Sequence, residues 1–352
     1  MSFINIFFFN YILPTISQSI LTLLIVMLIL AIFRGIHPRY KTALYSLIIF
    51  KALSRFLLGS PHIIKTLESY PQSQSKGLFI YIPDPTKMIP FRDFAYEVKF
   101  FDISYFQNET FLLFLIICVG ILIFLIYRWI GIHFFYKQLL REKEINPSKE
   151  KGLYRFVEQL CKKMKIKKVK LLESKKISSP FTVGIINPTI IIPRAVLDDL
   201  TEIELQQIVT HEIMHVKRRD SIKKWFLTII GDLLFFAPPI YFARKKINEY
   251  IEQDCDFRTI QLSKNPKDLA QGILKIASII KEYELSQPKP MIISNHFLYR
   301  SSDLKQRIIS FSKVKDLKTR RWKTVLFFIF YIVSLIYQLS WAITLSGRQL
   351  VF

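Results

Sequence analysis

Long apolar runs dominate the hydrophobic pattern of this 352-residue chain. Residues 12–33 carry no charge, and residues 110–130 carry only Arg128, near one end of the run. At 1.5 Å per residue, both runs are long enough to span the hydrocarbon core of a bilayer. A third run at 325–345 is flanked by bases, and a weaker one at 42–58 is interrupted by two bases. The pattern predicts an integral membrane protein with four transmembrane helices.

Charge gives these spans an orientation. The chain is 51% hydrophobic and yet carries a formal net charge of +23. Residues 1–59 hold five bases and no acids, residues 60–109 hold five bases and six acids, and residues 135–352 hold 39 bases and 21 acids. Because basic segments tend to stay on the cytoplasmic side, we expect the segment 135–323 to be cytoplasmic. The weak span at 42–58 is required by parity, since only then do all the basic segments lie on one side.

These expectations divide the chain into six parts. They are a first transmembrane pair (1–59, spans about 12–33 and 42–58), an extracellular loop (60–109), a third transmembrane helix (110–134), a cytoplasmic domain (135–323), a fourth transmembrane helix (324–346) and a short extracellular tail (347–352). Both termini are then extracellular. The lipid bilayer is the expected partner of the basic, apolar chain. Direct nucleic-acid binding is not indicated, because the apolar runs need a bilayer and no nucleic-acid motif occurs.

Past residue 135 the pattern changes to short periodic elements. A short strand is predicted at 169–174, and prolines between β-branched residues predict a hairpin or an edge strand within 178–197. Thr201, three residues before Glu204, gives the capping-box pattern that opens a helix. An amphipathic helix is predicted over 152–166 from apolar residues at helical spacing, namely Leu153, Phe156, Leu160 and Met164. The predicted fold class is therefore mainly α, with an α+β cytoplasmic domain.

The stretch HEIMH, residues 211–215, lies on the helix that Thr201 opens. Residues four apart share one face of a helix, so His211 and His215 can direct their rings at one ion. Glu212 projects beside them, where it can accept a proton from an attacking water. The pattern predicts one catalytic zinc ion with Glu212 as general base. The alternative is a helix with two incidental histidines.

A catalytic zinc site needs a third protein ligand. Glu252 and Asp256 are one helical turn apart in the stretch NEYIEQDCD. Glu252 as the third ligand, with Asp256 holding the second ring nitrogen of a ligand histidine, would give a His2Glu site. The alternative for both carboxylates is a solvated helix face. The remaining histidines lie near membrane boundaries, in the extracellular loop or near the last span: His37, His133, His62 and His296.

The segment between the two motifs must reverse direction if they share a metal. Residues 225–242 are apolar enough to cross a bilayer, and a crossing would put His211 and Glu252 in different compartments. Asp232 in the middle of the segment, and the two prolines that follow, are consistent with a re-entrant or interfacial hairpin. We therefore expect the site at the cytoplasmic face of the membrane.

Four stretches follow one another along the chain in this order: SPFTVGIINPTIIIP, HEIMHVKRRD, the apolar segment 225–242 and EQDCD. On the basis of these stretches, the chain resembles the membrane-bound zinc metallopeptidases of the BlaR1/MecR1 type, the M56 family. The resemblance extends over the whole chain, with three spans, a cytoplasmic gluzincin-type domain and a fourth span. It implies a bacterial cell-membrane protein in signal transduction for β-lactam antibiotic resistance. It also implies His211, His215 and Glu252 as zinc ligands, Glu212 as general base and Asp256 as a supporting carboxylate.

The resemblance also implies a substrate-binding strand. The segment 182–192 is similar to the edge strand that pairs with the substrate main chain in related zincins. The residues expected to take part are Thr182, Val183, Gly184, Ile190 and Ile191.

Self-cleavage is a further implication of the resemblance. The stretch SNHFLYRSSDLKQRI, residues 294–308, resembles the region that is cut in the family, and the candidate bond is His296–Phe297. Where the family pattern would have a serine before the phenylalanine, this chain has His296. The alternative is a plain connecting loop.

One departure concerns the signal. BlaR1 and MecR1 continue past the fourth span into an extracellular penicillin-binding domain, whereas this chain stops at Phe352. We expect a zinc endopeptidase that cleaves itself and a cytoplasmic protein such as a winged-helix repressor, with a second copy of the chain as a further partner. The alternatives are a constitutive peptidase for membrane-protein quality control and a non-enzymatic membrane transducer.

Overall fold

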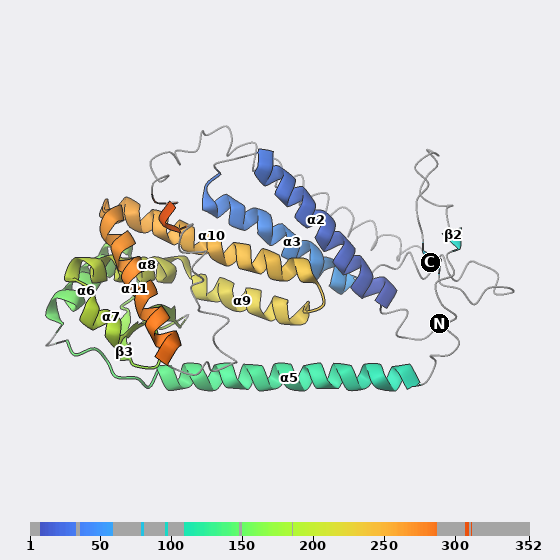
Figure 1. Ribbon diagram of the computed structural model, residues 1–352, viewed down its shortest axis with the longest axis horizontal. Coiled ribbons are helices and arrows are strands. Elements are labelled where there is room, and N and C mark those ends of the chain that lie inside the picture. Colours follow the sequence, from blue (N-terminus) through green and yellow to red (C-terminus); the bar gives the residue numbers. More distant parts are fainter. Residues whose placement is uncertain are drawn as a thin grey trace.

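The computed structural model describes residues 8–32, 36–58, 79–80, 96–97, 109–147, 150–184, 186–286, 307–309 and 311. In these residues the fold is mainly helical, with a small sheet at one end of a set of long helices (Figure 1). The N-terminal elements are η1 (a π-helix, Phe8–Ile12), α2 (Leu13–Ile32), α3 (Pro38–Leu58), β1 (Phe79–Ile80), β2 (Tyr96–Glu97) and α5 (Glu109–Leu139). The following elements are α6 (Lys151–Met164), β3 (Lys170–Ser174), β4 (Phe181–Val183), β5 (Thr189–Pro193), α7 (Arg194–Asp199), α8 (Glu202–Arg218), α9 (Asp220–Leu233), α10 (Pro238–Ser263) and α11 (Pro266–Ser286).

Two described helices are long and apolar enough to cross a bilayer. They are Leu13–Ile32 and Leu115–Leu139, which coincide with the first and third predicted spans. The predicted second span at 42–58 forms a helix, α3, but α3 is not one of these two, so its crossing stays a prediction. The predicted fourth span and tail (324–352) lie outside the described residues, as does most of the predicted loop at 60–109, apart from β1 and β2, which pair antiparallel.

The predicted amphipathic helix, strand and hairpin of the domain after residue 135 are confirmed as α6, β3 and β4–β5. The three strands form one sheet in the order β3-β5-β4, with β3 parallel and β4 antiparallel to β5. Helices α6, α8 and α11 pack with the sheet around one apolar core, which includes Leu160, Ile190, Val209 and Ile273. The sheet and these helices gather at one end of the molecule (Figure 1).

The sheet order corrects part of the predicted substrate-binding strand. Ile190 and Ile191 belong to β5, the central strand, whose two edges are already paired with β3 and β4. Their main chain therefore cannot pair with a substrate, because the hydrogen-bonding positions on both sides of β5 are used. Thr182 and Val183 lie on β4, which is the edge strand of the described sheet. Gly184 follows β4 directly, with a positive φ of 88° that favours glycine.

The predicted reversal of the apolar segment at 225–242 is present as a helical hairpin. Helix α9 ends at Leu233, a turn follows, and α10 begins at Pro238. Proline is favoured in the first turn of a helix because the amide hydrogen it lacks has no partner there. The hairpin packs on α2 and α3 through a second apolar core that contains Leu44, Ile48, Leu227 and Ile240. Helix α10 thus lies beside the predicted first transmembrane pair (Figure 1).

Candidate metal centre

Helix α8 begins as predicted and carries the HEIMH residues into the protein interior. The Thr201 hydroxyl accepts a hydrogen bond from the Glu204 main-chain amide, and the Glu204 carboxylate accepts one from the Thr201 amide. This reciprocal cap fixes the first turn of the helix. Two turns further on, His211, Glu212 and His215 are all buried. The buried face of α8 thus contains three polar side chains that need partners.

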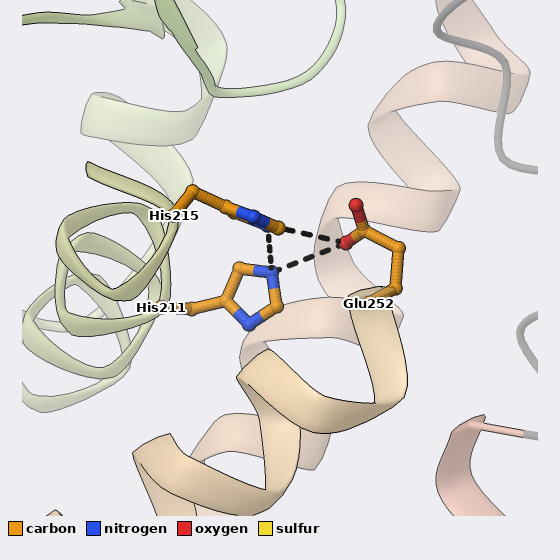
Figure 2. A group of neighbouring side chains, drawn as sticks. All are labelled: His211, His215 and Glu252. Carbon is orange, nitrogen blue, oxygen red and sulfur yellow. Dashed lines mark hydrogen bonds and ion pairs between the residues drawn. The ribbon is translucent and has the colours of Figure 1, made fainter. Parts of the chain in front are cut away.

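Helix α10 supplies those partners from the opposite side. His211 Nε2 lies 3.1 Å from His215 Nε2, and Glu252 Oε2 lies 3.3 Å from the first nitrogen and 3.4 Å from the second. Figure 2 shows the two rings and the carboxylate converging on one point between the helices. The hairpin makes this approach possible because it brings α10 back alongside α8 after the chain has passed through α9.

The outer ring nitrogens of both histidines have carboxylate neighbours. His211 Nδ1 lies 3.0 Å from Asp256 Oδ1, and His215 Nδ1 lies 3.0 Å from Asp220 Oδ2. A carboxylate at Nδ1 favours the tautomer that carries the proton there, which leaves the Nε2 lone pair directed at the common point. Asp256 therefore lies beside His211, which is the position that the sequence predicts for a supporting carboxylate.

Asp220 reaches His215 because the chain turns sharply between two helices. Arg219 ends α8 with a left-handed backbone conformation, φ 54°, and α9 begins at the next residue. The turn folds Asp220 back onto the ring that lies five residues earlier. Asp220 is the last residue of the stretch HEIMHVKRRD. Spacing alone does not show this contact, which depends on the break at Arg219.

Glu252 is shared between the histidines and a lysine. The Lys224 ammonium donates a hydrogen bond to Glu252 Oε1 at 2.9 Å, so Oε2 is the oxygen that faces the two rings.

Burial raises the pKa of Glu252, but the Lys224 and His215 charges outweigh it and hold that pKa well below its usual range. Burial lowers the pKa of His211, yet the Asp256 and Glu252 carboxylates outweigh burial, so the pKa is raised. For His215 too, burial lowers the pKa while neighbouring groups, Glu252 and Asp220 among them, raise it well above its ordinary value.

The donor set fits a zinc ion. Tetrahedral zinc with bonds of about 2.0–2.1 Å holds its ligand atoms roughly 3.3 Å apart. The distances of 3.1, 3.3 and 3.4 Å among His211 Nε2, His215 Nε2 and Glu252 Oε2 match that spacing. Two nitrogens and one carboxylate oxygen are also a ligand combination found in catalytic zinc sites. The described residues therefore support the zinc site that the sequence predicts.

Glu212 lies against the edge strand. The Thr182 hydroxyl donates a hydrogen bond to Glu212 Oε2 at 2.9 Å. This bond connects β4 to the carboxylate that follows the first histidine of HEIMH. The predicted substrate strand and the predicted general base are thus neighbours, although they are 30 residues apart in the chain.

A second group of polar side chains lies behind His215. Cys255 Sγ is 3.3 Å from His215 Nδ1 and 3.4 Å from Asp220 Oδ2. Two cations already contact Asp220, since Lys223 Nζ lies 2.8 Å and Arg218 Nε 3.4 Å from its carboxylate oxygens. Their positive charge opposes a second metal ion at this place. We interpret the group as support for the ring of His215.

Arg307 is a site residue that the sequence analysis did not identify. Its guanidinium donates two hydrogen bonds to Asp256, from Nε at 2.7 Å and from Nη2 at 2.6 Å. Both side chains are buried. The stretch SNHFLYRSSDLKQRI includes this arginine, but nothing in that stretch shows its contact with Asp256, which spans 51 residues of sequence. A pocket beside the site is lined by Arg307 together with Pro180, Ile208, His211, Glu212, Ile273, Ile276 and Ala277.

Helix α10 also carries two tyrosines, Tyr241 and Tyr250. Tyr241 precedes Glu252 by three helical turns on α10, which is about 16 Å along the axis. The ring of Tyr250 stacks on that of Tyr45 in α3, with centroids 5.9 Å apart. His296 and the candidate bond His296–Phe297 lie outside the described residues.

Comparison with known families identifies the chain's relatives. The family model of the BlaR1 peptidase M56 matches residues 10–311. The chain belongs to the M56 peptidase family. The match begins within η1 and ends at Phe311, so it includes every residue of the site described above. Membership implies a metallopeptidase, in agreement with the donor set.

The individual relatives are distant members of the M56 family. Regulatory protein BlaR1 of Bacillus licheniformis is 28% identical over 145 residues, which are 41% of this chain and 23% of that protein. The methicillin resistance MecR1 protein of Staphylococcus aureus is 23% identical over 175 residues, 49% of this chain and 29% of that protein. BlaR1 of Staphylococcus aureus is 23% identical over 242 residues, 68% of this chain and 39% of that protein. The chain thus spans well under half the length of these relatives.

Proposed function

We propose that this protein is a zinc-dependent endopeptidase of the gluzincin type, anchored by four transmembrane helices, with its active site at the cytoplasmic face of the membrane. The observation that carries the proposal is the convergence of His211 Nε2, His215 Nε2 and Glu252 Oε2 within 3.1–3.4 Å of one another, with Glu212 adjacent. A structural zinc site needs no acidic residue in the position of Glu212. The site therefore supports a catalyst over a non-enzymatic transducer.

A zinc ion held by these three side chains would supply Lewis acidity for the attack of water on a peptide carbonyl. Glu212 accepts the proton of the attacking water and later delivers it to the leaving amine. The Thr182 hydroxyl holds Glu212 Oε2 in place for both transfers. Asp256 and Asp220 keep the rings of His211 and His215 in the orientation that directs Nε2 at the site.

The substrate would bind as an added strand on β4. The sheet order leaves one edge of β4 without a strand partner among the described residues, and Thr182 places that strand next to Glu212. A peptide that pairs with β4 gains main-chain hydrogen bonds without a requirement for one particular sequence. Thr182 and Val183 are the strand residues that we assign to this role, with Gly184 at its end.

The substrates we propose are the chain itself and a cytoplasmic protein. The self-cleaved bond would be His296–Phe297, within the stretch SNHFLYRSSDLKQRI. The relatives described above are called a regulatory protein and a methicillin resistance protein, which favours a regulatory target such as a winged-helix repressor. A second copy of the chain is a further proposed partner.

The test compares the wild-type protein with Glu212→Ala, both purified in detergent, with bound zinc quantified. We expect one zinc ion in each and a shorter fragment, cut within residues 294–308, only in the wild type. Loss of a general base should slow cleavage by about 10²–10⁴-fold. If neither protein holds zinc, the peptidase assignment fails. If zinc is bound and both proteins are cut at the same rate, Glu212 is not the general base.

A further inference from the structure

Asp256 is a buried carboxylate whose charge and position depend on Arg307. The Arg307 guanidinium contacts both carboxylate oxygens, at 2.7 and 2.6 Å. Only 4% of the Arg307 side chain and 1% of the Asp256 side chain are exposed. A two-point contact of this kind fixes the plane of the carboxylate as well as its place, which a single point charge cannot do.

The oriented carboxylate in turn reaches a predicted zinc ligand. Asp256 Oδ1, which accepts the hydrogen bond from Arg307 Nη2, is also the atom 3.0 Å from His211 Nδ1. Arg307 thus contacts Asp256, and Asp256 contacts the ring of His211, which faces the proposed zinc position. Rotation of the carboxylate would move its negative charge away from Nδ1 and with it the preference for the tautomer that keeps Nε2 free.

The short segment around Arg307 is anchored separately from the ion pair. Phe311, one helical turn further on, is buried in the same apolar core as Leu205, Val209 and Ile273. The arginine therefore reaches the site from a separate segment that is buried in this core, and not from the hairpin that supplies Glu252 and Asp256.

We infer that Arg307 is a positioning residue of the metal centre, which acts on His211 through Asp256. The inference rests on the proposed zinc site and goes beyond it. The other residues of the site come from the segment 182–256, whereas Arg307 lies on the C-terminal side of residues 287–306. If the chain is cut at His296–Phe297, Arg307 therefore belongs to a different polypeptide from every proposed zinc ligand.

The experiment measures metal affinity by competition with a chelator, and the absorption spectrum of the cobalt-substituted protein, in the full-length chain in detergent. We expect Arg307→Gln to weaken zinc binding by about 10–100-fold and to alter the cobalt spectrum, because His211 loses its fixed orientation. Arg307→Lys keeps the charge but not the two-point contact, so its affinity should lie between those of Arg307→Gln and the wild type. Arg194→Gln, which removes an arginine that contacts both carboxylate oxygens of Asp198 outside the site, is the matched control and should keep the wild-type affinity.

A double-mutant cycle separates action through Asp256 from a general loss of structure. In the Asp256→Asn background, Arg307→Gln should weaken zinc binding further by less than about threefold, because residues in one network do not act additively. The inference is overturned if the two effects add, or if Arg307→Gln and Arg307→Lys both keep the wild-type zinc affinity and cobalt spectrum. A wild-type protein that binds no zinc would overturn the proposed function as well. A wild type that binds zinc beside unaffected Arg307 variants would overturn this inference alone.

Discussion

At the scale of single residues, each side chain of the candidate metal centre has a second polar partner that holds it in place. Each proposed ligand histidine has a carboxylate at Nδ1, and Glu252 has Lys224 on the oxygen that faces away from the rings. Glu212 has the Thr182 hydroxyl. These second partners orient the groups that would bind metal or transfer protons.

Zinc binding should become weaker as the pH falls through neutrality. Neighbouring carboxylates raise the pKa of both His211 and His215. A raised pKa means that protons stay on the rings to a higher pH, and a protonated ring cannot bind zinc. Full affinity is therefore present only above the raised pKa values, and it is lost as the pH falls through them. Chelator competition should show affinity falling by at least about tenfold per pH unit below that range. An affinity independent of pH would contradict histidine ligation.

Thr182→Val should slow cleavage without loss of zinc. The substitution keeps the shape of the side chain but removes the hydroxyl that donates to Glu212 Oε2. A hydrogen bond to a charged group contributes about 1.5–3 kcal/mol, so kcat should fall by roughly tenfold to a hundredfold. Thr189→Val on the neighbouring strand β5 is the control, because its hydroxyl contacts the Asn187 carbonyl instead. Equal rates for both variants would remove Thr182 from the mechanism.

At the scale of elements, one ion pair connects the third predicted span to the hairpin. Arg128 on α5 donates a hydrogen bond to Asp232 on α9 at 2.8 Å, and Trp129 Nε1 donates to the same oxygen at 3.1 Å. The Trp129 ring also meets Trp225 edge-on, with centroids 5.3 Å apart. Asp232 was singled out in the sequence as a polar residue inside an apolar segment. Its partner on α5 explains how a charge is accommodated there.

The Arg128–Asp232 pair should show strong coupling in a double-mutant cycle. Removing one member of a partly buried pair leaves the other without compensation, which costs more than removing both. We expect Arg128→Gln and Asp232→Asn to lower the free energy of unfolding in detergent with a coupling energy of about 1–3 kcal/mol. The exposed pair Lys162–Glu158 on α6 is the control and should show little or no coupling. Additive effects at Arg128 and Asp232 would mean that the pair does not hold α5 to the hairpin.

At the scale of the whole molecule, the hairpin brings the site close to the loop between the first two predicted spans. His37, just before α3, lies 3.7 Å from Asp254 on α10, and its ring meets that of Phe257 edge-on. Charge predicts that the basic segments, this loop and the domain after residue 135 among them, lie on one side of the membrane. The contact between them agrees with that assignment, because segments on opposite sides of a bilayer could not touch.

Labelling should place both ends of the hairpin in the cytoplasm. Lys175 precedes the hairpin and Lys264 follows it, and both are exposed. In a variant with Cys118 and Cys161 replaced by serine, and with Cys255 buried, a cysteine introduced at either position should react with a membrane-impermeant maleimide only after the cells are permeabilised. A cysteine at Ser75, in the predicted extracellular loop, is the control and should react in intact cells. Opposite reactivity at 175 and 264 would show that the segment 225–242 crosses the membrane.

The sequence by itself determined the features that depend on short-range spacing. The four-residue separation of His211 and His215, the same separation of Glu252 and Asp256, and the cap at Thr201 each need only one helix to form. The length and charge of the apolar runs likewise fixed where α2 and α5 lie. The sequence also required the chain to reverse direction between His211 and Glu252, because residues on opposite sides of a bilayer cannot bind the same metal ion.

Only the tertiary structure decided which distant residues complete the site. Asp220 depends on the left-handed turn at Arg219, and Arg307 comes from a segment that Phe311 anchors in a core shared with α8 and α11. The pairing of β5 with both neighbours, which removes Ile190 and Ile191 from substrate binding, depends on β3 joining the sheet. No local pattern encodes such contacts, because they follow from how separate elements pack. Helical spacing in the sequence identified the proposed metal ligands, whereas the packing of separate elements determined which residues hold those ligands in place.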